Sequence, residues 1–237
     1  TLTIDSQNDG TLYASAGWSG EGIYKSKDGG ATWSPANSGL RAIAISRLAI
    51  APGEPATWYV NSLVRPLLFR SADDGRNWNQ LEFRYLLAID PHDPATLYGT
   101  GSAGLSKSRD RGTSWIPANA GLPEGDCPGV GSLTIDPQDT RTVYAGLYAC
   151  SEESRDGGVW KSTDGGASWA KLGSQPDGGY IYGLETDPNN NALYAWNGMG
   201  LFRSTDRGAS WSMLRSGYVN GFTIDPQNPD TLYSVVN

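Results

Sequence analysis

The sequence contains very little histidine, methionine or cysteine. Its 237 residues include one His, two Met and two Cys. A single His argues against a multi-histidine metal or catalytic site, because such sites draw on several imidazoles. We expect His92, in the polar turn at residues 90–94, to be solvated. We predict neither a metal nor a cofactor.

Long apolar runs and an excess of positive charge are also absent. No run approaches the roughly 18 apolar residues that a membrane helix needs. There are 18 basic against 25 acidic residues, which gives a net charge of −7 and a pI near 4.7. This balance argues against nucleic acid and against anionic membrane surfaces as partners.

Glycine and large aromatic residues are abundant instead. The chain has 31 Gly, 9 Trp and 12 Tyr. This composition favours short strands joined by tight turns. A length of 237 residues suits one all-β domain.

A repeated segment, Ser-x-Asp-x-Gly-x-x-Trp, organises the sequence. It occurs five times, at Ser-to-Ser spacings of 45, 37, 54 and 42 residues. Its defining residues are Ser26, Asp28, Gly30, Trp33; Ser71, Asp73, Gly75, Trp78; Ser108, Asp110, Gly112, Trp115; Ser162, Asp164, Gly166, Trp169; and Ser204, Asp206, Gly208, Trp211. A second pattern lies between the copies: an apolar run, usually Asp-Pro, and then Leu-Tyr or a variant. It occurs six times, with its tyrosines at Tyr13, Tyr59, Tyr98, Tyr144, Tyr194 and Tyr233.

Each period reads as four short antiparallel strands, which is the signature of a propeller blade. The repeated segment is the turn between the third and fourth strands, and the fourth strand begins at the Trp. Blades are predicted at residues 1–40, 41–83, 84–120, 121–174 and 175–217, with a partial sixth at 218–237. We therefore predict a single β-propeller with five full blades and a partial sixth. We expect it to be part of a longer propeller, or to be completed by another chain.

The residues of the repeated turn suit a structural role. Ser and Asp side chains accept hydrogen bonds from turn amides, and Gly permits positive φ. The Trp can pack between sheets. Each turn offers one carboxylate rather than a cluster, which argues against a metal site.

The repeated turns resemble the Asp-box, or BNR, repeat of sialidase-like β-propellers. The wider pattern, with "TIDPQDTRTVYAG" and "GVWKSTDGGASW", is similar to xyloglucan-cleaving glycoside hydrolases, sortilin-type receptors and a photosystem II assembly factor. These families differ in activity, so the resemblance predicts the fold more strongly than the function.

The strand order predicts which loops carry function. The connections between fourth and first strands and between second and third strands share one end of the propeller, opposite the repeated turns. Variable loops on a rigid scaffold usually carry function. Cys127 and Cys150 both fall in these loops, and we predict a disulfide between them and an extracellular or periplasmic location.

The first strands are predicted to line a central channel. Period-two alternation directs Leu2, Leu48, Leu87, Leu133, Leu184 and Phe222 into the blades and directs Leu86 and mostly small residues toward the channel. Arg47 and Glu185 interrupt that small-residue pattern and are candidates for a charge pair.

Our main functional hypothesis is a secreted binding or scaffold module for a glycan or a protein. Aromatic side chains with polar rims suit sugar and peptide surfaces. The candidate ligand-binding residues on the loop end are Trp18, Arg47, Tyr148, Tyr180, Tyr182, Trp196 and Tyr218.

The alternative hypothesis is a glycoside hydrolase, sialidase-like or xyloglucanase-like, which needs two carboxyl groups. Weak catalytic candidates are Glu185, Asp126, Glu124 and Glu152. The Arg-Ile-Pro segment of sialidases is absent, and no catalytic residue of xyloglucanases can be matched. Therefore we favour a non-enzymatic module.

A third hypothesis is an assembly or interaction factor with a basic surface. Its candidate residues precede the turns and recur with the repeat, which favours a structural role for them. They are Lys25, Arg70, Lys107, Lys161 and Arg203.

Overall fold

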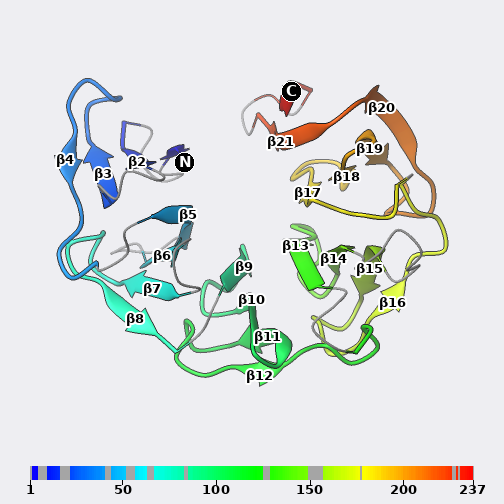
Figure 1. Ribbon diagram of the computed structural model, residues 1–237, viewed down its shortest axis with the longest axis horizontal. Coiled ribbons are helices and arrows are strands. Elements are labelled where there is room, and N and C mark those ends of the chain that lie inside the picture. Colours follow the sequence, from blue (N-terminus) through cyan, green and yellow to red (C-terminus); the bar gives the residue numbers. More distant parts are fainter. Residues whose placement is uncertain are drawn as a thin grey trace. The chain divides into compact units, whose positions relative to one another are not determined.

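The chain folds into short antiparallel sheets. The computed structural model describes residues 2–4, 10–16, 22–40, 44–51, 57–62, 67–82, 85–124, 129–148, 157–176, 178–225, 228 and 230–236. Within these residues all regular elements are strands (Figure 1). Five sheets have four strands and one has two. This confirms the predicted propeller architecture of five full blades and a partial sixth.

The strands follow the repeat closely. Repeats one and two contain β1 (Leu2–Ile4), β2 (Leu12–Ala16), β3 (Gly22–Ser26), β4 (Ser34–Pro35), β5 (Ile45–Ala51), β6 (Thr57–Ser62), β7 (Leu68–Ser71) and β8 (Asn79–Leu81). Repeats three and four contain β9 (Tyr85–Ile89), β10 (Leu97–Gly101), β11 (Gly104–Ser108), β12 (Ile116–Pro117), β13 (Gly129–Ile135), β14 (Val143–Tyr148), β15 (Gly158–Ser162) and β16 (Ala170–Lys171). Repeats five and six contain β17 (Gly183–Thr186), β18 (Leu193–Trp196), β19 (Gly200–Ser204), β20 (Ser212–Ser216), β21 (Val219–Ile224) and β22 (Leu232–Val236).

In every full sheet the strands pair in chain order, each antiparallel to its neighbour. The fourth strand is the outermost. It begins one residue after the turn Trp and not at the Trp itself, as at Ser34 after Trp33. The indole is therefore the last residue of the turn, which leaves its ring free to pack on a neighbouring repeat.

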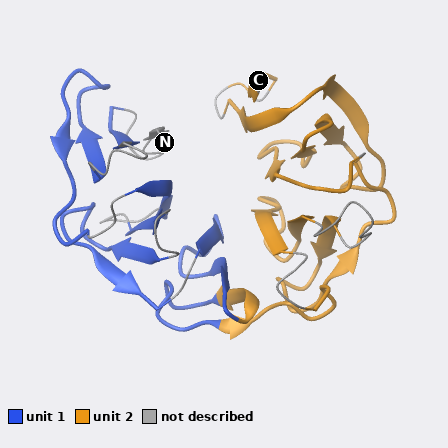
Figure 2. Ribbon diagram, viewed as in Figure 1, with its two compact units in different colours: residues 1–102, 108–115 blue, residues 103–107, 116–237 orange. Residues whose placement is uncertain are grey.

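The contacts divide the chain into two compact units (Figure 2). Unit 1 comprises residues 1–102 and 108–115, and unit 2 comprises residues 103–107 and 116–237. That the six repeats form one domain with the predicted blade boundaries stays a prediction.

Unit 1 is built around large aromatic side chains. Trp58 is fully buried, with its ring 4.2 Å from that of Tyr13 and 6.1 Å from that of Trp78. Burying a side chain of this size contributes about 2–3 kcal/mol. A Cβ on Gly75 would overlap the Trp58 ring, so only glycine fits this position of the turn.

The alternation predicted for the first strands is present, with one exception. Leu48, Leu87, Leu133, Leu184 and Phe222 are all at most 9% exposed. Leu86 was predicted to face the channel, but it is 2% exposed and belongs to the core. The cause is a bulge between β9 and β10, which changes the register at Tyr98 and Gly99.

Neighbouring repeats are joined through a backbone carbonyl. The Tyr59 hydroxyl and the Arg70 guanidinium both donate to the carbonyl oxygen of Arg111, at 3.2 and 3.4 Å. Tyr144 donates in the same way to the carbonyl of Arg207, at 3.5 Å. Each acceptor follows the turn Asp of the next repeat. We call this arrangement the carbonyl contact.

The basic residues before the turns contribute to the same junction. Lys107 Nζ donates to the carbonyl oxygen of Gly165, 2.9 Å away. Lys161 lies over the Tyr144 ring at 5.4 Å, and Arg203 lies over the Tyr194 ring at 5.7 Å. Lys107 therefore links two repeats, and Lys161 and Arg203 pack on tyrosine rings. These contacts agree with the structural role that the recurrence of the basic residues predicts.

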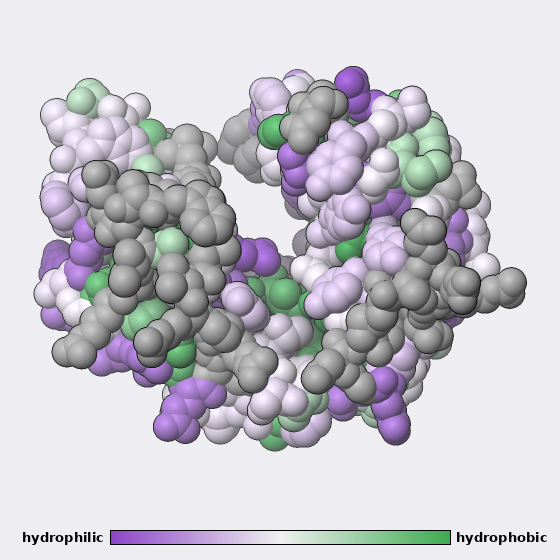
Figure 3. Space-filling view, viewed as in Figure 1, coloured by the Kyte–Doolittle hydropathy of each residue, from purple (hydrophilic) through white to green (hydrophobic). Residues whose placement is uncertain are grey.

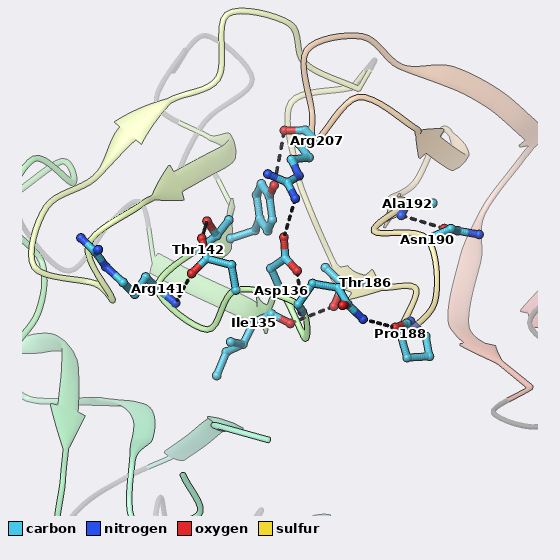
Figure 4. Close-up of polar contacts among 12 residues, drawn as sticks. Ile135, Asp136, Arg141, Thr142, Thr186, Pro188, Asn190, Ala192 and Arg207 are labelled. Carbon is cyan, nitrogen blue, oxygen red and sulfur yellow. Dashed lines mark hydrogen bonds and ion pairs between the residues drawn. The ribbon is translucent and has the colours of Figure 1, made fainter. Parts of the chain in front are cut away.

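Asp136 forms a second junction between repeats four and five (Figure 4). Asp136 is 1% exposed, and its carboxylate accepts from the backbone N–H of Gln138 at 2.9 Å. The Arg207 guanidinium lies 4.0 Å from it. Asn191 lies between these two side chains. In the amide orientation that suits both partners, its nitrogen donates to Asp136 and its oxygen accepts from Arg207, each at 3.2 Å. Burial of this acid is tolerated because it is paired and hydrogen-bonded.

Candidate functional site

The five repeated turns share one hydrogen-bond pattern. Each Ser Oγ donates to an Asp Oδ1 at 2.7–2.8 Å and accepts from the Gly amide at 2.8–2.9 Å. The same Oδ1 accepts from the amide four residues after the Asp, and Oδ2 accepts from that residue's side chain. Both carboxylate oxygens are therefore used within the turn.

The hydrogen bonds keep these acids ionised. The pKa is lowered to about 2 in Asp28, Asp110, Asp164 and Asp206. The largest causes are the hydrogen bonds from the side chain and the backbone N–H of the residue four positions later, and the Ser hydroxyl adds to them. The pKa of Asp73 is lowered for the same reason, with Asn77 as the main donor. A carboxylate held in this way is a poor proton donor at neutral pH. No group of three or more metal-ligating side chains occurs among the described residues.

The turns define one end of each sheet. In three repeats a turn amide donates to the loop between the first and second strands: Gly29 to Gly10, Arg111 to Ala95, and Gly165 to Arg141, at 2.8–3.0 Å. We call this the turn end. The connections between the second and third strands, and between fourth and first strands, meet at the opposite end, which we call the loop end.

Two exposed tyrosines lie together at the loop end of unit 2. Tyr182 precedes β17 and is 47% exposed; Tyr218 precedes β21 and is 42% exposed. Their ring centroids are 5.7 Å apart, with the planes tilted by 54°. The Tyr182 amide donates to the Trp196 carbonyl at 2.9 Å, which fixes this segment against the end of β18.

The loop between β18 and β19 borders these rings. A Cβ on Gly198 would lie 3.5 Å from the Tyr182 hydroxyl and 3.9 Å from Tyr218. Met199 is 55% exposed, and its carbonyl accepts from the Gly217 amide. We define the aromatic face as Tyr182, Tyr218 and Met199. The sequence analysis did not find Met199, although an apolar residue in a polar Asn-Gly-x-Gly loop was a usable signal.

Tyr148 lies beside the segment that leads to the aromatic face. It ends β14, is 43% exposed, and its ring lies against Gly129 and Gly131. The neighbouring Leu147 carbonyl accepts from the Ile181 amide at 3.4 Å. The strand end therefore holds the backbone between Tyr180 and Tyr182.

Other predicted ligand-binding residues have a packing role or stand apart. Trp196 packs directly on Gly183 and lies 5.7 Å from the Phe222 ring. Tyr180 is half-buried. Trp18 lies outside the described residues, as do Cys127 and Cys150, so the disulfide stays a prediction.

Arg47 and Glu185 belong to different units, and their pairing also stays a prediction. Arg47 is exposed on β5. Nearby protein partly desolvates its guanidinium and lowers its pKa, although an arginine stays charged at physiological pH.

Glu185 connects two first strands. Its Oε1 accepts from the Ile224 amide at 3.3 Å and from the Thr223 hydroxyl at 3.4 Å. Burial raises the pKa of Glu185, and these hydrogen bonds only partly oppose that shift. A raised pKa is a property of general acids. Of the other catalytic candidates, Glu124 is exposed, while Asp126 and Glu152 lie outside the described residues.

The described surface supports a polar ligand more than an apolar partner. On the face in Figure 3 purple and pale surfaces outweigh scattered green ones. No described helix is long or apolar enough to cross a membrane. The candidate site thus offers exposed tyrosine rings on which a ligand can stack, polar groups around them, and the half-buried carboxylate of Glu185.

Comparison with curated proteins identifies xyloglucanases. The chain is 36% identical over 121 residues to xyloglucanase Xgh74A of Acetivibrio thermocellus, which covers 44% of this chain and 13% of that protein. It is 35% identical over 111 residues to the "Probable oligoxyloglucan-reducing end-specific xyloglucanase" of Neosartorya fischeri, with coverages of 44% and 13%. A xyloglucanase of Hypocrea jecorina is 35% identical over 133 residues, with coverages of 48% and 14%. The chain thus spans about a seventh or less of these relatives. No protein-family model matches it.

Solved structures show the same fold. An ancestral GH74 enzyme superposes with a TM-score of 0.76 at 19% identity, covering 97% of this chain and 33% of that one. The GH74 xyloglucanase of Xanthomonas campestris gives 0.74 at 22% identity, covering 98% and 41%. YCF48 bound to D1 peptide gives 0.63 at 14% identity, covering 99% and 73%. At these identities the likeness concerns the fold alone.

These comparisons support the hydrolase alternative better than the binding-scaffold hypothesis that we preferred from sequence. The preference for a non-enzymatic module has no support among the curated relatives, which are xyloglucanases over the matched part of the chain.

Proposed function

We propose that this chain is part of a GH74-like glycoside hydrolase acting on xyloglucan, and that its aromatic face binds the glucan. The curated relatives support the substrate class, since those described above are xyloglucanases. The repeated turns, interpreted as Asp-boxes, provide the scaffold.

One observation carries the binding part of the proposal: the adjacent exposed rings of Tyr182 and Tyr218. Sugar rings present apolar C–H faces that pack on aromatic rings, while their hydroxyl groups need a polar rim. The two tyrosines supply both, because each ring is exposed and each carries a hydroxyl. Met199 extends the contact area with a side chain that adapts to irregular shapes.

Hydrolysis requires a second carboxyl group near the first. Inverting enzymes hold the two about 6.5–9.5 Å apart and retaining enzymes about 5 Å apart. Glu185 is the described acid with a raised pKa. Its candidate partners are Glu124, Asp126 and Glu152. We therefore assign glucan binding to this chain and hydrolysis to the longer protein, of which these repeats form a part.

Binding is tested with the purified chain, soluble xyloglucan and isothermal titration calorimetry. Tyr182→Ala and Tyr218→Ala should each weaken binding about three- to tenfold, the range expected for loss of one ring contact. The matched control is Tyr233→Ala, an exposed tyrosine on β22. Equal losses in all three variants, or no binding by the parent chain, would contradict the assignment.

Catalysis is tested by the release of reducing sugar from xyloglucan. Because hydrolysis is assigned to the longer protein, we expect the parent chain to bind xyloglucan without releasing reducing sugar. Release by the parent chain that Glu185→Gln abolishes, with xyloglucan binding retained, would instead place the general acid in this chain. An extracellular location and the Cys127–Cys150 disulfide accompany this proposal as predictions. Mass measurement with and without reductant tests the disulfide.

A further inference from the structure

The short loop between β18 and β19 holds both tyrosines of the aromatic face, and one buried side chain organises that loop. The side chain is Asn197, which is 1% exposed. A ligand on the aromatic face does not reach a side chain buried to this degree, so any effect of Asn197 on binding is indirect. The inference rests on the proposed glucan binding, because it concerns how the same face is held.

Tyr218 is held by this loop on both sides. The amide of Gly217, which precedes it, donates to the Met199 carbonyl at 2.9 Å. The amide of Val219, which follows it, donates to the Asn197 carbonyl at 3.5 Å. Two carbonyls of one loop therefore fix the backbone that carries the Tyr218 ring.

Tyr182 is held by the residue that leads into the loop. Its amide donates to the Trp196 carbonyl at 2.9 Å. The carbonyls that hold Tyr182 and Val219 thus belong to two consecutive residues, Trp196 and Asn197. Because consecutive residues are a fixed distance apart, this part of the chain controls the separation of the two tyrosine rings, whose centroids lie 5.7 Å apart.

The Asn197 side chain directs these carbonyls. Its Oδ1 accepts from the amides of Met199 at 2.8 Å and Gly200 at 3.1 Å, as in an Asx turn. The residues that flank a two-residue hairpin loop ordinarily exchange two backbone hydrogen bonds. Here the Asn197 amide donates to the Gly200 carbonyl at 3.0 Å, but the Gly200 amide donates to the side-chain oxygen. The Asn197 carbonyl is thereby available to Val219 in the next repeat.

The segment that leads to Tyr182 packs on the same loop. A Cβ on Gly178 would lie 2.7 Å from Met199 Cγ and 3.1 Å from Asn197 Nδ2. Gly178 also has a φ of +99°, so both the available space and the backbone conformation require glycine at this position. The loop around Asn197 therefore contacts the chain on both sides of the tyrosine pair.

The corresponding loop of repeat three shows that a hairpin of this length does not itself need asparagine. Residues 101–104 read Gly-Ser-Ala-Gly where residues 197–200 read Asn-Gly-Met-Gly. In repeat three the Ala103 carbonyl, the counterpart of the Met199 carbonyl, accepts from Asn119 Nδ2 at 3.2 Å. Of these two loops, the one that begins with asparagine is the one beside the aromatic face.

We propose that Asn197 is the positioning residue of the aromatic face. Its side-chain oxygen fixes the loop between β18 and β19, and the carbonyls of Trp196, Asn197 and Met199 then hold Tyr182 and Tyr218 in place for a glucan. A site that is ordered in advance loses less conformational freedom on binding, which raises its affinity. Removal of the Asn197 oxygen therefore weakens the binding of a ligand that this side chain does not touch.

The proposal is tested by isothermal titration calorimetry with soluble xyloglucan in a double-mutant cycle of Asn197→Ala and Tyr218→Ala. We expect Asn197→Ala to weaken binding about tenfold in the parent chain, and about threefold or less where Tyr218 is already alanine. An equal loss in the two backgrounds would overturn the proposal, because a residue that only stabilises the fold acts independently of the ring. Asn119→Ala is the matched control and should leave binding unchanged.

The conservative variant Asn197→Asp tests the side-chain oxygen. Aspartate forms the same Asx turn, because it keeps an oxygen that accepts from the amides of Met199 and Gly200. We expect its affinity for xyloglucan to lie within about threefold of the parent value, well above that of Asn197→Ala. Equal losses in the aspartate and alanine variants would overturn the role assigned to this oxygen.

Amide hydrogen exchange separates this inference from the proposed function, because it needs no glucan. Asn197→Ala should speed exchange of the Gly217 and Val219 amides about tenfold or more and leave the amides of β14 unchanged. This result in a parent chain that binds no xyloglucan would contradict the proposed function and support the hold of Asn197 on the tyrosines. Unchanged exchange in a chain that binds xyloglucan would overturn the positioning role alone.

Discussion

The Tyr59 hydroxyl donates to the carbonyl oxygen of Arg111, 3.2 Å away and in the next repeat. Arg111 has a φ of 58°, in the left-handed region. The residue after the turn Asp has positive φ in all five turns: Gly29, Asp74, Arg111, Gly165 and Arg207. This conformation costs a non-glycine residue about 1 kcal/mol. The junction between repeats offsets that cost.

Removing the Tyr59 hydroxyl should weaken unit 1. Tyr59→Phe loses one hydrogen bond, and we expect the free energy of unfolding to fall by about 1 kcal/mol. Urea unfolding followed by tryptophan fluorescence measures it. The matched control is Tyr194→Phe, whose hydroxyl has no acceptor within the described residues, and a change below about 0.5 kcal/mol is expected. Equal losses in the two variants would mean that the carbonyl contact contributes nothing.

The turn acids should make stability fall in acid. Their pKa of about 2 in the folded protein lies below the value of about 3.9 in an unfolded chain. The unfolded state therefore binds more protons between pH 4 and 2, and the stabilisation present above pH 4 is lost as the pH falls through that window. Asp164→Asn should lower the urea midpoint at pH 7 and flatten its decline toward pH 2. The contrary result would be an Asp164→Asn variant whose urea midpoint falls with pH as steeply as that of the parent chain.

Glu185 should have the opposite pH dependence. Burial raises its folded pKa, so the folded state binds more protons between the unfolded pKa near 4.3 and the raised value. Its contribution becomes less favourable as the pH rises through that window. Glu185→Gln retains an oxygen acceptor for Ile224 and removes the charge. We therefore expect it to raise the Tm at pH 7 relative to the parent and to change it little at pH 4. A lower Tm at pH 7 would show that the ionised form is the stabilising one.

Truncating the turn tryptophans should have unequal effects. Trp78 is 5% exposed and contacts the preceding repeat, whereas Trp33 is 39% exposed and donates within its own turn, to Gly30. Trp78→Ala should cost about 3–5 kcal/mol, and Trp33→Ala about 1 kcal/mol or less. Calorimetry of the two variants compares them. Similar losses would mean that the Trp stabilises its turn rather than the junction between repeats.

The fold was predictable because the same residues recur at each turn. Ser, Asp and Gly select one turn geometry by local hydrogen bonds and positive φ, which operate without knowledge of distant residues. The bulge that buries Leu86 was not predictable, since it arises from pairing with β10. Unequal burial of the tryptophans depends on neighbouring repeats in the same way.

One structural motif was visible in the sequence and was missed. Pro-Ala-Asn-x-Gly-Leu occurs at residues 35–40 and 117–122. In both copies the loop seats the next turn Trp: Trp78 donates its amide to Ser38, and Trp169 donates to Ala120. A Cβ on Gly121 would overlap the Trp169 carbonyl, so the loop needs glycine there.

The candidate site was predictable in position but not in composition. Strand order alone places Tyr182 and Tyr218 at the loop end. It does not distinguish an exposed ring from a packing ring, and so Trp196 was grouped with them although it packs on Gly183. That distinction depends on which side chains fill the space between sheets.

The carbonyl contact has a consequence for how such arrays change over time. Its acceptor is a backbone atom, so Gly165, Arg111 and Arg207 serve equally well. A duplicated repeat finds its counterpart in any neighbour without matched side chains. The number of repeats can therefore grow or shrink by whole repeats. The loop ends can also diversify without altering the carbonyl contacts between repeats.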